Sequence, residues 1–469
     1  MSIDALAAPT LDPSPGVDRW AAVGEDLAAA EEARRARMRR MRFDTIAVHG
    51  VYDMAAALDN QGSILEPTYL SPAQHFVDSD QLETALAYRM PAWGYTRIAN
   101  PTLHYLEETL ALLETYGTRL TASAHVAASG MAAIHIATSP FLADRGSSAP
   151  RPNIVVSAKC YGGTFMLFSE RYGRERGIDI RWVTDPMDLA AWDCVIDEST
   201  RFVYGELPSN PALAMFDTAA VAEIAHARGL PLIVDSTVAT PALLRPLGLG
   251  ADIVVHSLSK AIGGSGLAIG GALIARHDLV WVAGTDEQRA DFARWVKLLP
   301  ARDHGGGLAP LSAMAILSDL RDLRLRMDAW SATTLAVARF LDGHPAVESV
   351  AYPGLPGQPG YDLATRDMWL ADGDATGRPA NRYGSLLAFT VRGGALAARR
   401  IFDRFELIWR ATDLGRVKSV ATIPAISTHQ QQGEEGRALA AVPSGQIRLS
   451  VGGEHADDLI ADLARVLDD

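Results

Sequence analysis

The stretch Asp252-Ile-Val-Val-His-Ser-Leu-Ser-Lys260-Ala-Ile-Gly-Gly-Ser-Gly266 decides the fold and the chemistry of this chain. An apolar strand runs into a loop of hydroxyls, one lysine and then glycines. A buried lysine loses its charge readily, so its amine can attack an aldehyde and hold it as a Schiff base. The hydroxyls of Ser257 and Ser259 can donate to a phosphate, and glycines let the backbone approach a ligand closely. The segment therefore predicts a lysine site at the end of a strand.

A second apolar strand, Pro231-Leu-Ile-Val-Asp235, ends in a carboxylate. Short Val- and Ile-rich runs also occur at 153–157 and 201–205, and helix-like stretches such as 218–229 separate the runs. Strands that alternate with helices predict a largely parallel sheet, which binds ligands at the carboxyl ends of its strands. Asp235 and Lys260 both lie at or just past such ends. An acid of this kind can keep the ring nitrogen of pyridoxal phosphate (PLP) protonated, which makes the ring an electron sink.

Further motifs follow one another along the chain. They are Thr45-Ile-Ala-Val-His-Gly50, Tyr95-Thr-Arg-Ile-Ala-Asn-Pro-Thr102, Ser129-Gly-Met-Ala-Ala133, Tyr161-Gly-Gly-Thr164, Glu206-Leu-Pro-Ser-Asn-Pro211, Tyr352-Pro-Gly-Leu355 and Gln446-Ile-Arg-Leu-Ser450. Together with the lysine segment they resemble the Cys/Met-metabolism family of PLP enzymes, which includes cystathionine γ-synthase, methionine γ-lyase and O-acetylhomoserine sulfhydrylase. The resemblance covers roughly residues 43–469.

The resemblance implies an α/β protein of PLP fold-type I. Its large domain is expected to hold a mostly parallel seven-stranded sheet, and a smaller α/β domain is expected at the C-terminus. The expected parts are an N-terminal extension at 1–42, an arm at 43–100 that contributes to the neighbouring subunit's site, a PLP-binding large domain at 101–310, and a C-terminal domain with a long linking helix at 311–469.

Local composition refines this division. Residues 1–23, rich in Ala, Pro and Asp, are expected to be mobile, whereas 24–42 are good helix formers. Residues 312–342 predict one long amphipathic helix. The polar insert at 366–382 predicts a surface loop.

The resemblance assigns most cofactor contacts to the large domain. Lys260 is the Schiff-base lysine, and Asp235 pairs with the pyridine nitrogen. Gly130 and Met131 open a helix whose N–H groups bind the phosphate, and Ser257 and Ser259 complete that cradle. Tyr161 lies over the ring and can assist proton transfer, and Asn210 lies near the ring oxygen.

Tyr95 and Arg97 belong to a segment that crosses to the neighbouring subunit in relatives and binds its phosphate there. Arginine suits a phosphate by its charge and its fork geometry. A homodimer or homotetramer with shared active sites is therefore expected, and Tyr95 is a further candidate for protonating the leaving group.

The substrate side departs from the family pattern. Arg448 matches the arginine that clamps a substrate α-carboxylate. Asp413 replaces a serine in the segment Asp413-Leu-Gly-Arg-Val-Lys-Ser419, and a bare carboxylate there would repel the substrate carboxylate. Asp413 must therefore pair with a cation, which is either Arg416, Lys418 or Arg448, or a positively charged substrate.

The expected reaction is γ-elimination or γ-replacement on an L-amino acid with a leaving group at Cγ, such as a homoserine ester, through a vinylglycine ketimine. A second, nucleophilic substrate is needed for replacement. The alternative is a specialised enzyme that takes a cationic γ-substituted amino acid, similar to S-adenosylmethionine or canavanine, for C–C or C–N bond formation or γ-lysis.

Bulk composition narrows the partners and the compartment. A net charge of −13 over 469 residues argues against nucleic acid or an anionic membrane as the partner. Cys160 and Cys194 are the two cysteines, which indicates no disulfide framework and a cytoplasmic protein. No metal site is expected, because His49, His256 and His429 lack ligand partners at metal-binding spacing.

Overall fold

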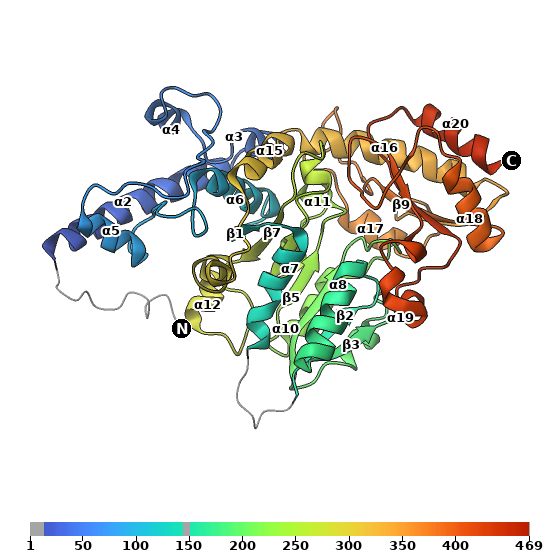
Figure 1. Cartoon of the computed structure of the whole chain (residues 1–469), viewed down its shortest axis with the longest axis horizontal. Helices are drawn as coiled ribbons and strands as arrows, with labels where there is room; N and C mark the ends of the chain where they lie inside the picture. Colours follow the sequence, from blue (N-terminus) through green and yellow to red (C-terminus); the bar gives the residue numbers. More distant parts are fainter. Residues whose placement is uncertain (1–13, 144–150, 469) are drawn as a thin grey trace.

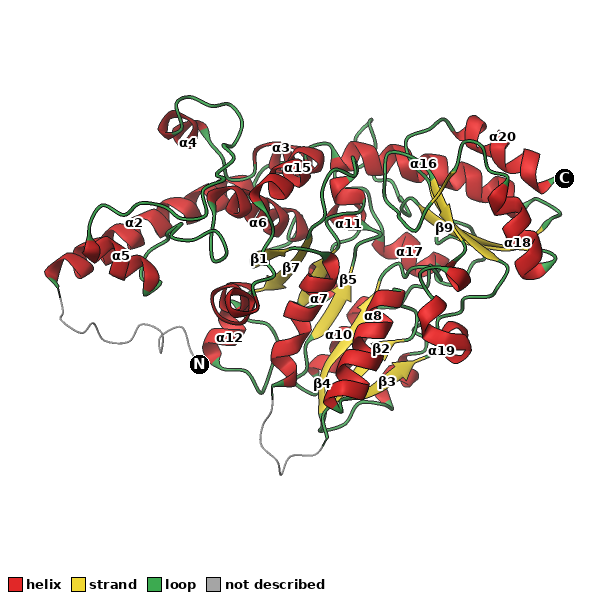
Figure 2. Cartoon of the chain, in the orientation of Figure 1, coloured by secondary structure: helices red, strands yellow, loops and turns green. Residues whose placement is uncertain are grey.

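The computed structural model describes residues 14–143 and 151–468. Its strands form two separate sheets, one in the middle of the chain and a smaller one near the C-terminus (Figures 1 and 2). The mostly parallel large sheet and the smaller sheet domain confirm the fold class that the sequence predicts. No helix in the described ranges is long and apolar enough to cross a membrane.

The large sheet has the strand order β1-β7-β6-β5-β4-β2-β3. Only β7 runs antiparallel to its neighbours among these described strands, which makes the sheet mostly parallel. The bounds are β1 Ala122–Ala127, β2 Asn153–Ser157, β3 Asp179–Val183, β4 Thr200–Glu206, β5 Leu232–Asp235, β6 Ile253–His256 and β7 Gly271–Arg276. The carboxyl ends of β4, β5 and β6 therefore lie side by side, where Glu206 pairs in register with Asp235.

The strands of this sheet are buried on both faces, as parallel sheets generally are. Alternate residues such as Val155, Val203 and Val234 join one core, and their neighbours Ile154 and Ile233 join another. Helices α6, α7, α10 and α13 contact strands of this sheet. The helices of this part of the chain are α6 Pro101–Glu114, α7 Gly130–Thr138, α8 Gly162–Met166, α9 Leu189–Asp193, α10 Thr218–His226, α11 Thr240–Leu243, α12 Asp286–Ala290, α13 Phe292–Val296 and α14 Arg302–His304. This packing holds the strand ends in fixed positions.

The smaller sheet has the order β10-β11-β12-β9-β8. Its strands are β8 Val347–Ala351, β9 Leu386–Val391, β10 Trp409–Arg410, β11 Val420–Thr422 and β12 Gln446–Ser450. The helices of this part are α16 Leu323–Asp342, α17 Tyr361–Asp367, α18 Gly394–Asp403, α19 Gly433–Leu439 and α20 Ala456–Leu467. Strand β12 pairs with both β9 and β11 and carries the buried Arg448.

The predicted helix at 312–342 is wrong in one respect, because the chain forms two helices there. Helix α15 spans Pro310–Leu320, and α16 begins at Leu323. The break needs no glycine or proline. Leu320 and Leu323 are both fully buried, and Arg321 between them forms an ion pair with Glu66. These tertiary contacts turn the chain, and sequence periodicity does not reveal them.

The N-terminal segments lie beside the body of the protein (Figure 1). They contain α2 Pro15–Met38, α3 Phe43–His49, α4 Met54–Asp59 and α5 Ser79–Leu86. The prediction of mobility for 1–23 is wrong for 15–23, which belong to α2, and residues 1–13 lie outside the described ranges. Ser14 caps this helix and Pro15 occupies its first turn, so the helix starts earlier than composition suggests.

The insert at 366–382 is not a simple surface loop. Leu370 and Ala371 are buried, and Asp372 accepts hydrogen bonds from the Phe43 backbone at 2.8 Å and from the Tyr116 hydroxyl. The insert therefore fastens the region near α3 to the C-terminal part of the chain. The polar composition of the insert does not predict this role, because only a few of its residues, such as Leu370, Ala371 and Asp372, are buried or bonded to other segments.

Candidate active site

The ends of β4 and β5 bring two buried carboxylates together. Asp235 accepts a hydrogen bond from the Thr237 backbone N–H at 3.0 Å and is only 7% exposed. Burial raises the pKa of Asp235 above its usual range. Burial, followed by the charge of Asp235, raises the pKa of Glu206 well above its usual range. A buried acid at this edge suits a basic ring nitrogen, which would supply the missing positive partner.

Glu206 joins parts of the site that are far apart in the sequence. Its Oε2 accepts a hydrogen bond from the Tyr161 backbone N–H at 2.6 Å, and its Oε1 accepts one from the Asn210 backbone N–H at 2.7 Å. Glu206 was not predicted as a site residue. The available signal in the sequence was a carboxylate at the end of the apolar run 201–205, whereas its register with Asp235 is a finding of the structure.

The predicted phosphate cradle lies where β6 meets the start of α7. Ser129 caps α7, and its hydroxyl accepts a hydrogen bond from the Ala132 N–H at 3.1 Å. Gly130 approaches Ser257 so closely that a Cβ on Gly130 would lie 2.7 Å from the Ser257 Cβ. Backbone N–H groups at a helix start of this kind can bind an anion.

The hydroxyls of the two serines have different surroundings. Ser257 lies against Gly130, whereas the Ser259 hydroxyl donates to the Gly270 carbonyl at 3.1 Å and accepts from the Gly270 N–H at 3.0 Å. The phosphate contact predicted for Ser259 would require its hydroxyl to release the Gly270 carbonyl. The contact predicted for Ser257 requires no such change.

Tyr161 and Met131 meet around Gly163. A Cβ on Gly163 would lie 2.5 Å from Tyr161 Cε1 and 3.1 Å from the Met131 sulfur. Tyr161 directly precedes α8, and its backbone is fixed by Glu206. The structure thus brings together Tyr161, Met131 and the strand-end acids, although their roles toward a cofactor stay predictions.

Arg448 on β12 connects the small sheet to the large one. Its Nη1 donates to the Asn210 side-chain oxygen at 3.0 Å, and its Nη2 donates to the Asp413 backbone carbonyl at 2.8 Å. The side chain is fully buried, and this burial lowers its pKa to about 10. Within the described residues, the Arg448 Nε has no hydrogen-bond partner, which leaves a buried donor for an anionic ligand.

Lys260 reaches the segment in which the sequence departs from the family. Its Nζ lies 2.6 Å from Asp413 Oδ1, and Arg416 Nε donates to Asp413 Oδ2 at 2.5 Å. Burial lowers the pKa of Lys260, and Asp413 partly opposes this effect. Arg416 was one of the cations predicted for Asp413, whereas Lys260 was not among them. Of the other two predicted cations, Lys418 lies over the Trp409 ring at 4.4 Å, and Arg448 donates to the Asp413 backbone carbonyl. The carboxylate is thus already paired with two cations of the chain, and a cationic substrate is not needed to balance it.

Tyr95 and Arg97 lie elsewhere within this chain. Tyr95 is 45% exposed, and the Arg97 guanidinium lies over its ring at 5.5 Å. Arg97 Nη1 donates to the Arg302 carbonyl at 2.6 Å. Within the described ranges, their hydrogen bonds and ring contacts do not involve Lys260, Asp235 or Tyr161, so a role in a site would require another copy of the chain.

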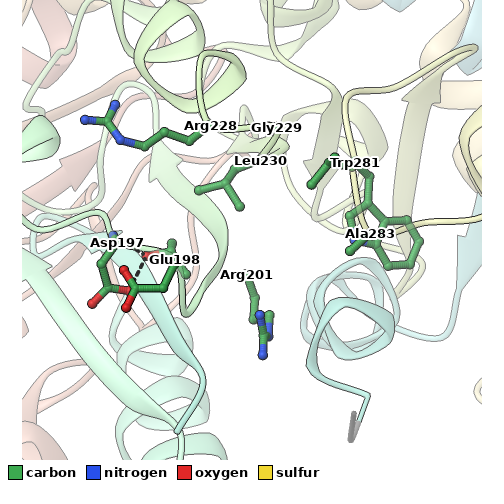
Figure 3. A pocket seen from close by; sticks show the side chains of 10 residues that line it. Asp197, Glu198, Arg201, Arg228, Gly229, Leu230, Trp281 and Ala283 are labelled. Carbon is green, nitrogen blue, oxygen red and sulfur yellow. Dashed lines mark hydrogen bonds between the residues drawn. The ribbon is translucent and has the colours of Figure 1, made fainter. Parts of the chain in front are cut away.

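A separate cavity of about 270 Å³ is lined by residues at the amino ends of β4 and β5 (Figure 3). Asp197 and Arg201 flank the start of β4, and Arg228, which forms an ion pair with Asp193 at 2.6 Å, precedes β5. This is the end of the parallel strands opposite to Asp235. None of the predicted site residues lines it.

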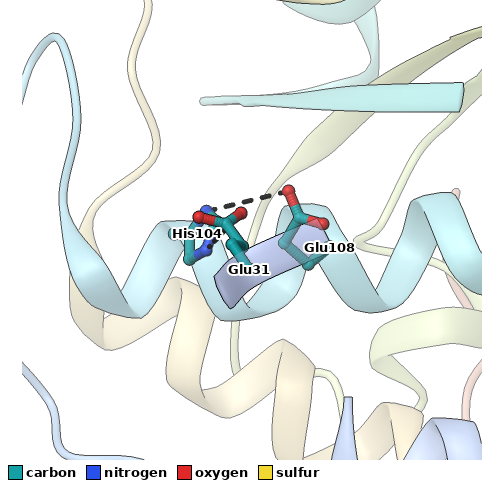
Figure 4. Close-up of side chains that lie close together, drawn as sticks. All are labelled: Glu31, His104 and Glu108. Atoms are coloured by element: carbon teal, nitrogen blue, oxygen red, sulfur yellow. Dashed lines mark ion pairs between the residues drawn. The ribbon is translucent and has the colours of Figure 1, made fainter. Parts of the chain in front are cut away.

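Glu31, His104 and Glu108 gather between α2 and α6 (Figure 4). Their ligand atoms lie within 4.8 Å of one another, as in some metal sites. However, Arg35 donates to both Glu31 and Glu108, at 2.7 Å in one of the contacts with Glu108. Burial opposes ionisation of Glu31, but the hydrogen bond and charge of His104 and the charge of Arg35 lower its pKa to about 2. The group is best described as an ion-pair network that attaches α2 to the body.

The site residues fit PLP on grounds of geometry and charge. At position 130 a side chain would collide with Ser257, so glycine keeps the phosphate cradle open, and Asp235 is a buried acid. Lys260 offers an amine, and the buried Arg448 Nε has no hydrogen-bond partner among the described residues. When bound, PLP would be held by Lys260, by Asp235 at its ring nitrogen and by the start of α7 at its phosphate.

Comparisons with known proteins agree with this fit. A family model described as Cys/Met metabolism PLP-dependent enzyme matches residues 44–468. The chain is 35% identical over 426 residues to an O-succinylhomoserine sulfhydrylase of Pseudomonas aeruginosa, with 91% of this chain and 95% of the relative covered. It is also 35% identical to an L-methionine γ-lyase of Pseudomonas deceptionensis, with 91% of this chain and 97% of that one covered.

A solved structure from Campylobacter jejuni, assigned as an O-acetylhomoserine (thiol)-lyase, superposes with a TM-score of 0.81 at 34% identity. The match covers 92% of this chain and 100% of the other, which carries a pyridoxyl-lysine 5′-monophosphate. With the family model matching nearly all of the described residues, this chain belongs to the Cys/Met metabolism family of PLP-dependent enzymes.

Proposed function

We propose that this enzyme catalyses γ-elimination or γ-replacement on an L-amino acid with a leaving group at Cγ, such as a homoserine ester. One observation carries the proposal. Lys260 and Arg448 both bind Asp413, so an amine that can move protons lies beside a cation that can hold a carboxylate. The sulfhydrylase and γ-lyase relatives support the same reaction class.

The residues of the chain would divide the work as follows. Arg448 binds the substrate α-carboxylate through its free Nε and thereby places Cα near the Lys260 amine. PLP, when bound, supplies the electron sink that makes the Cα and Cβ protons acidic. Lys260 removes the Cα proton and then acts at Cβ, because loss of the Cα proton alone does not expel a group two carbons away. The Tyr161 hydroxyl protonates the leaving group.

A second copy of the chain would complete the site. Tyr95 and Arg97 contact their own chain away from Lys260, and the neighbouring arm exposes large apolar side chains. Met54 is 87% exposed, and Ile64 is 92% exposed. Burying such residues against a second copy would stabilise a dimer and bring Tyr95 and Arg97 to the partner's phosphate cradle. We place the assembled enzyme in the cytoplasm, consistent with its free cysteines.

The deciding experiment is product analysis by mass spectrometry on the purified enzyme in D2O. O-acetylhomoserine, O-succinylhomoserine and methionine are supplied separately, without a nucleophile and then with sulfide. Release of 2-oxobutanoate without a nucleophile would identify elimination. Deuterium in recovered substrate at Cα and Cβ, with a new product only after sulfide is added, would identify replacement.

A Lys260→Ala variant serves as the blank in both arms. The proposal fails if the wild-type enzyme consumes none of these amino acids and introduces no deuterium into any of them. Cationic substrates such as S-adenosylmethionine and canavanine can be tested in the same assay. Turnover of these alone would contradict the homoserine-ester class.

A further inference from the structure

The segment that follows β10 contains a carboxylate aimed at the lysine of the site. Asp413 Oδ1 accepts hydrogen bonds from Lys260 Nζ at 2.6 Å and from the Leu414 backbone N–H at 2.9 Å. Its Oδ2 accepts from Arg416 Nε at 2.5 Å. A carboxylate has lone pairs on both oxygens, so Arg416 occupies one oxygen and leaves the other for the lysine.

The backbone, and not only these side chains, sets this distance. Residues 413–417 pack directly on 260–264: Gly415 lies so close that a Cβ would be 2.5 Å from the Ala261 nitrogen. Gly415 has φ +67°, a conformation that glycine adopts without strain. The Val417 N–H donates to the Gly264 carbonyl at 3.1 Å, which ties the two segments together.

Arg416 strengthens the same connection. Its Nη1 donates to the Gly263 carbonyl at 3.1 Å while its Nε holds Asp413. The arginine thus bridges the Asp413 segment and the loop that carries Lys260. A carboxylate held in this way has little freedom to turn away from the lysine, so the contact is preorganised.

We infer that Asp413 is a positioning residue for Lys260: its carboxylate, clamped by Arg416 and the Leu414 amide, receives the lysine ammonium whenever the lysine is not bonded to a cofactor aldehyde. The inference deepens the proposed function, on which its meaning for catalysis rests. The lysine would hold the proton taken from Cα as an ammonium beside Asp413, available for delivery to the next atom, rather than lose it to water.

The charged groups that face Lys260 set the expected signs. Asp413 favours the ammonium, whereas Arg416 from the same segment and Arg448 from β12 disfavour it. Removing the Asp413 charge should therefore make the free amine easier to obtain at a given pH. Removing the Arg416 charge should have the opposite effect. Loss of structure alone would move both variants in the same direction.

The test follows the capture of pyridoxal 5′-phosphate by the full-length chain, after hydroxylamine has removed the bound cofactor. In this step the neutral amine attacks the aldehyde, a C=N bond forms and water leaves, so the rate rises with pH as Lys260 loses its proton. The readout is the pH at which the capture rate reaches half its maximum. Lys260→Ala supplies the blank.

In Asp413→Asn, this midpoint should move to lower pH, and capture at neutral pH should be roughly tenfold faster. In Arg416→Gln, the midpoint should move to higher pH, and capture at neutral pH should be about threefold slower. Asp328→Asn is the matched control. Asp328, in α16, is also a half-buried acid paired with an arginine, Arg382, at 2.6 Å. Its midpoint should equal that of the wild type.

An unchanged midpoint in Asp413→Asn, or shifts of the same sign in both variants, would overturn the inference. Failure of the proposed function looks different. In that case the midpoints shift as expected, but the product assay finds no turnover of any γ-substituted amino acid.

Discussion

The two halves of the candidate site are built in contrasting ways. The half formed by the large sheet consists of buried acids at strand ends, with Asp235 7% and Glu206 4% exposed. The other half lies where the C-terminal loop around Asp413 meets Lys260, and the side chains of Asp413 and Lys260 are 33% and 26% exposed. A densely packed sheet fixes the first half, whereas ion pairs and backbone contacts between loops fix the second.

This contrast indicates where the enzyme can vary. Strand-end positions buried on both faces tolerate few substitutions, because each change disturbs packing and hydrogen bonds at once. A half-exposed loop can exchange a hydroxyl for a carboxylate if a cation is near. The chain follows this pattern: its cofactor-side motifs resemble the family pattern, and its departures lie in the loop around Asp413.

The largest expected effect comes from the residue shared by both halves. Lys260→Ala should lower kcat by at least about 10³-fold, because it removes the amine that we propose bonds the cofactor and moves protons. Borohydride reduction followed by peptide mass spectrometry should find the pyridoxyl group on Lys260 in the wild type only. Lys418→Ala is the control, since that lysine lies over Trp409. Labelling at another lysine in the wild type would contradict the assignment.

Asp235→Asn tests the buried half. We expect kcat to fall by roughly 10²–10³-fold, because an amide cannot hold the ring nitrogen protonated. Steady-state kinetics at saturating PLP would measure the loss. Activity within about twofold of wild type would show that this half does not act on the cofactor ring.

The same variant has a pH signature. Burial raises the pKa of both Asp235 and Glu206, so the folded protein favours their protonated forms. Stability from these groups is present below their ordinary pKa values and is lost as pH rises through the raised ones. Cofactor-free Asp235→Asn should therefore lose less thermal stability than wild type between acidic pH and pH ~8. Parallel Tm curves would contradict this expectation.

Arg448→Lys tests the junction of the halves. A lysine keeps the charge but cannot bind Asn210, the Asp413 carbonyl and a carboxylate with one planar fork. We expect kcat/KM for the amino acid to fall about 100-fold, mainly through KM. Affinity for PLP, measured by fluorescence titration, should change little. A matching loss of PLP affinity would place Arg448 in the cofactor half instead.

The smallest effects should separate the two serines. Ser257→Ala should weaken PLP binding by about fivefold, since Ser257 lies at the Gly130 cradle. Ser259→Ala should cost about 1 kcal/mol of stability through its lost bonds to Gly270 and leave PLP affinity nearly unchanged. Dissociation constants and urea denaturation would measure both. A loss of PLP affinity in Ser259→Ala but not in Ser257→Ala would instead support the predicted phosphate contact of Ser259.

Sequence patterns predicted elements and strand-end residues better than side-chain partners. The predicted strand Pro231–Asp235 forms β5 Leu232–Asp235, and the apolar run that precedes Lys260 forms β6 Ile253–His256. The helical periodicity at 312–342 predicts one continuous helix. The break at Arg321 is not predicted, because it depends on contacts with Glu66 and the core. The start of α2 at Pro15 was not predicted, because the high Ala, Pro and Asp content of 1–23 suggested mobility. Ser14 followed by Pro15 is a typical helix start, but it was not used.

The sequence by itself determined the family, the parallel sheet and the order of the motifs, and it predicted Lys260 as the cofactor lysine, because strand periodicity and motif spacing are local properties of the chain. Only the tertiary structure decided that Glu206 joins Tyr161 to Asn210, that Asp413 faces Lys260, and that Tyr95 and Arg97 lie apart from that lysine in their own chain. The Asp413–Lys260 contact joins residues 153 positions apart, and the Arg97–Arg302 contact joins residues 205 positions apart. Chain packing alone sets such distances, and a change of one ångström decides whether a charge is paired.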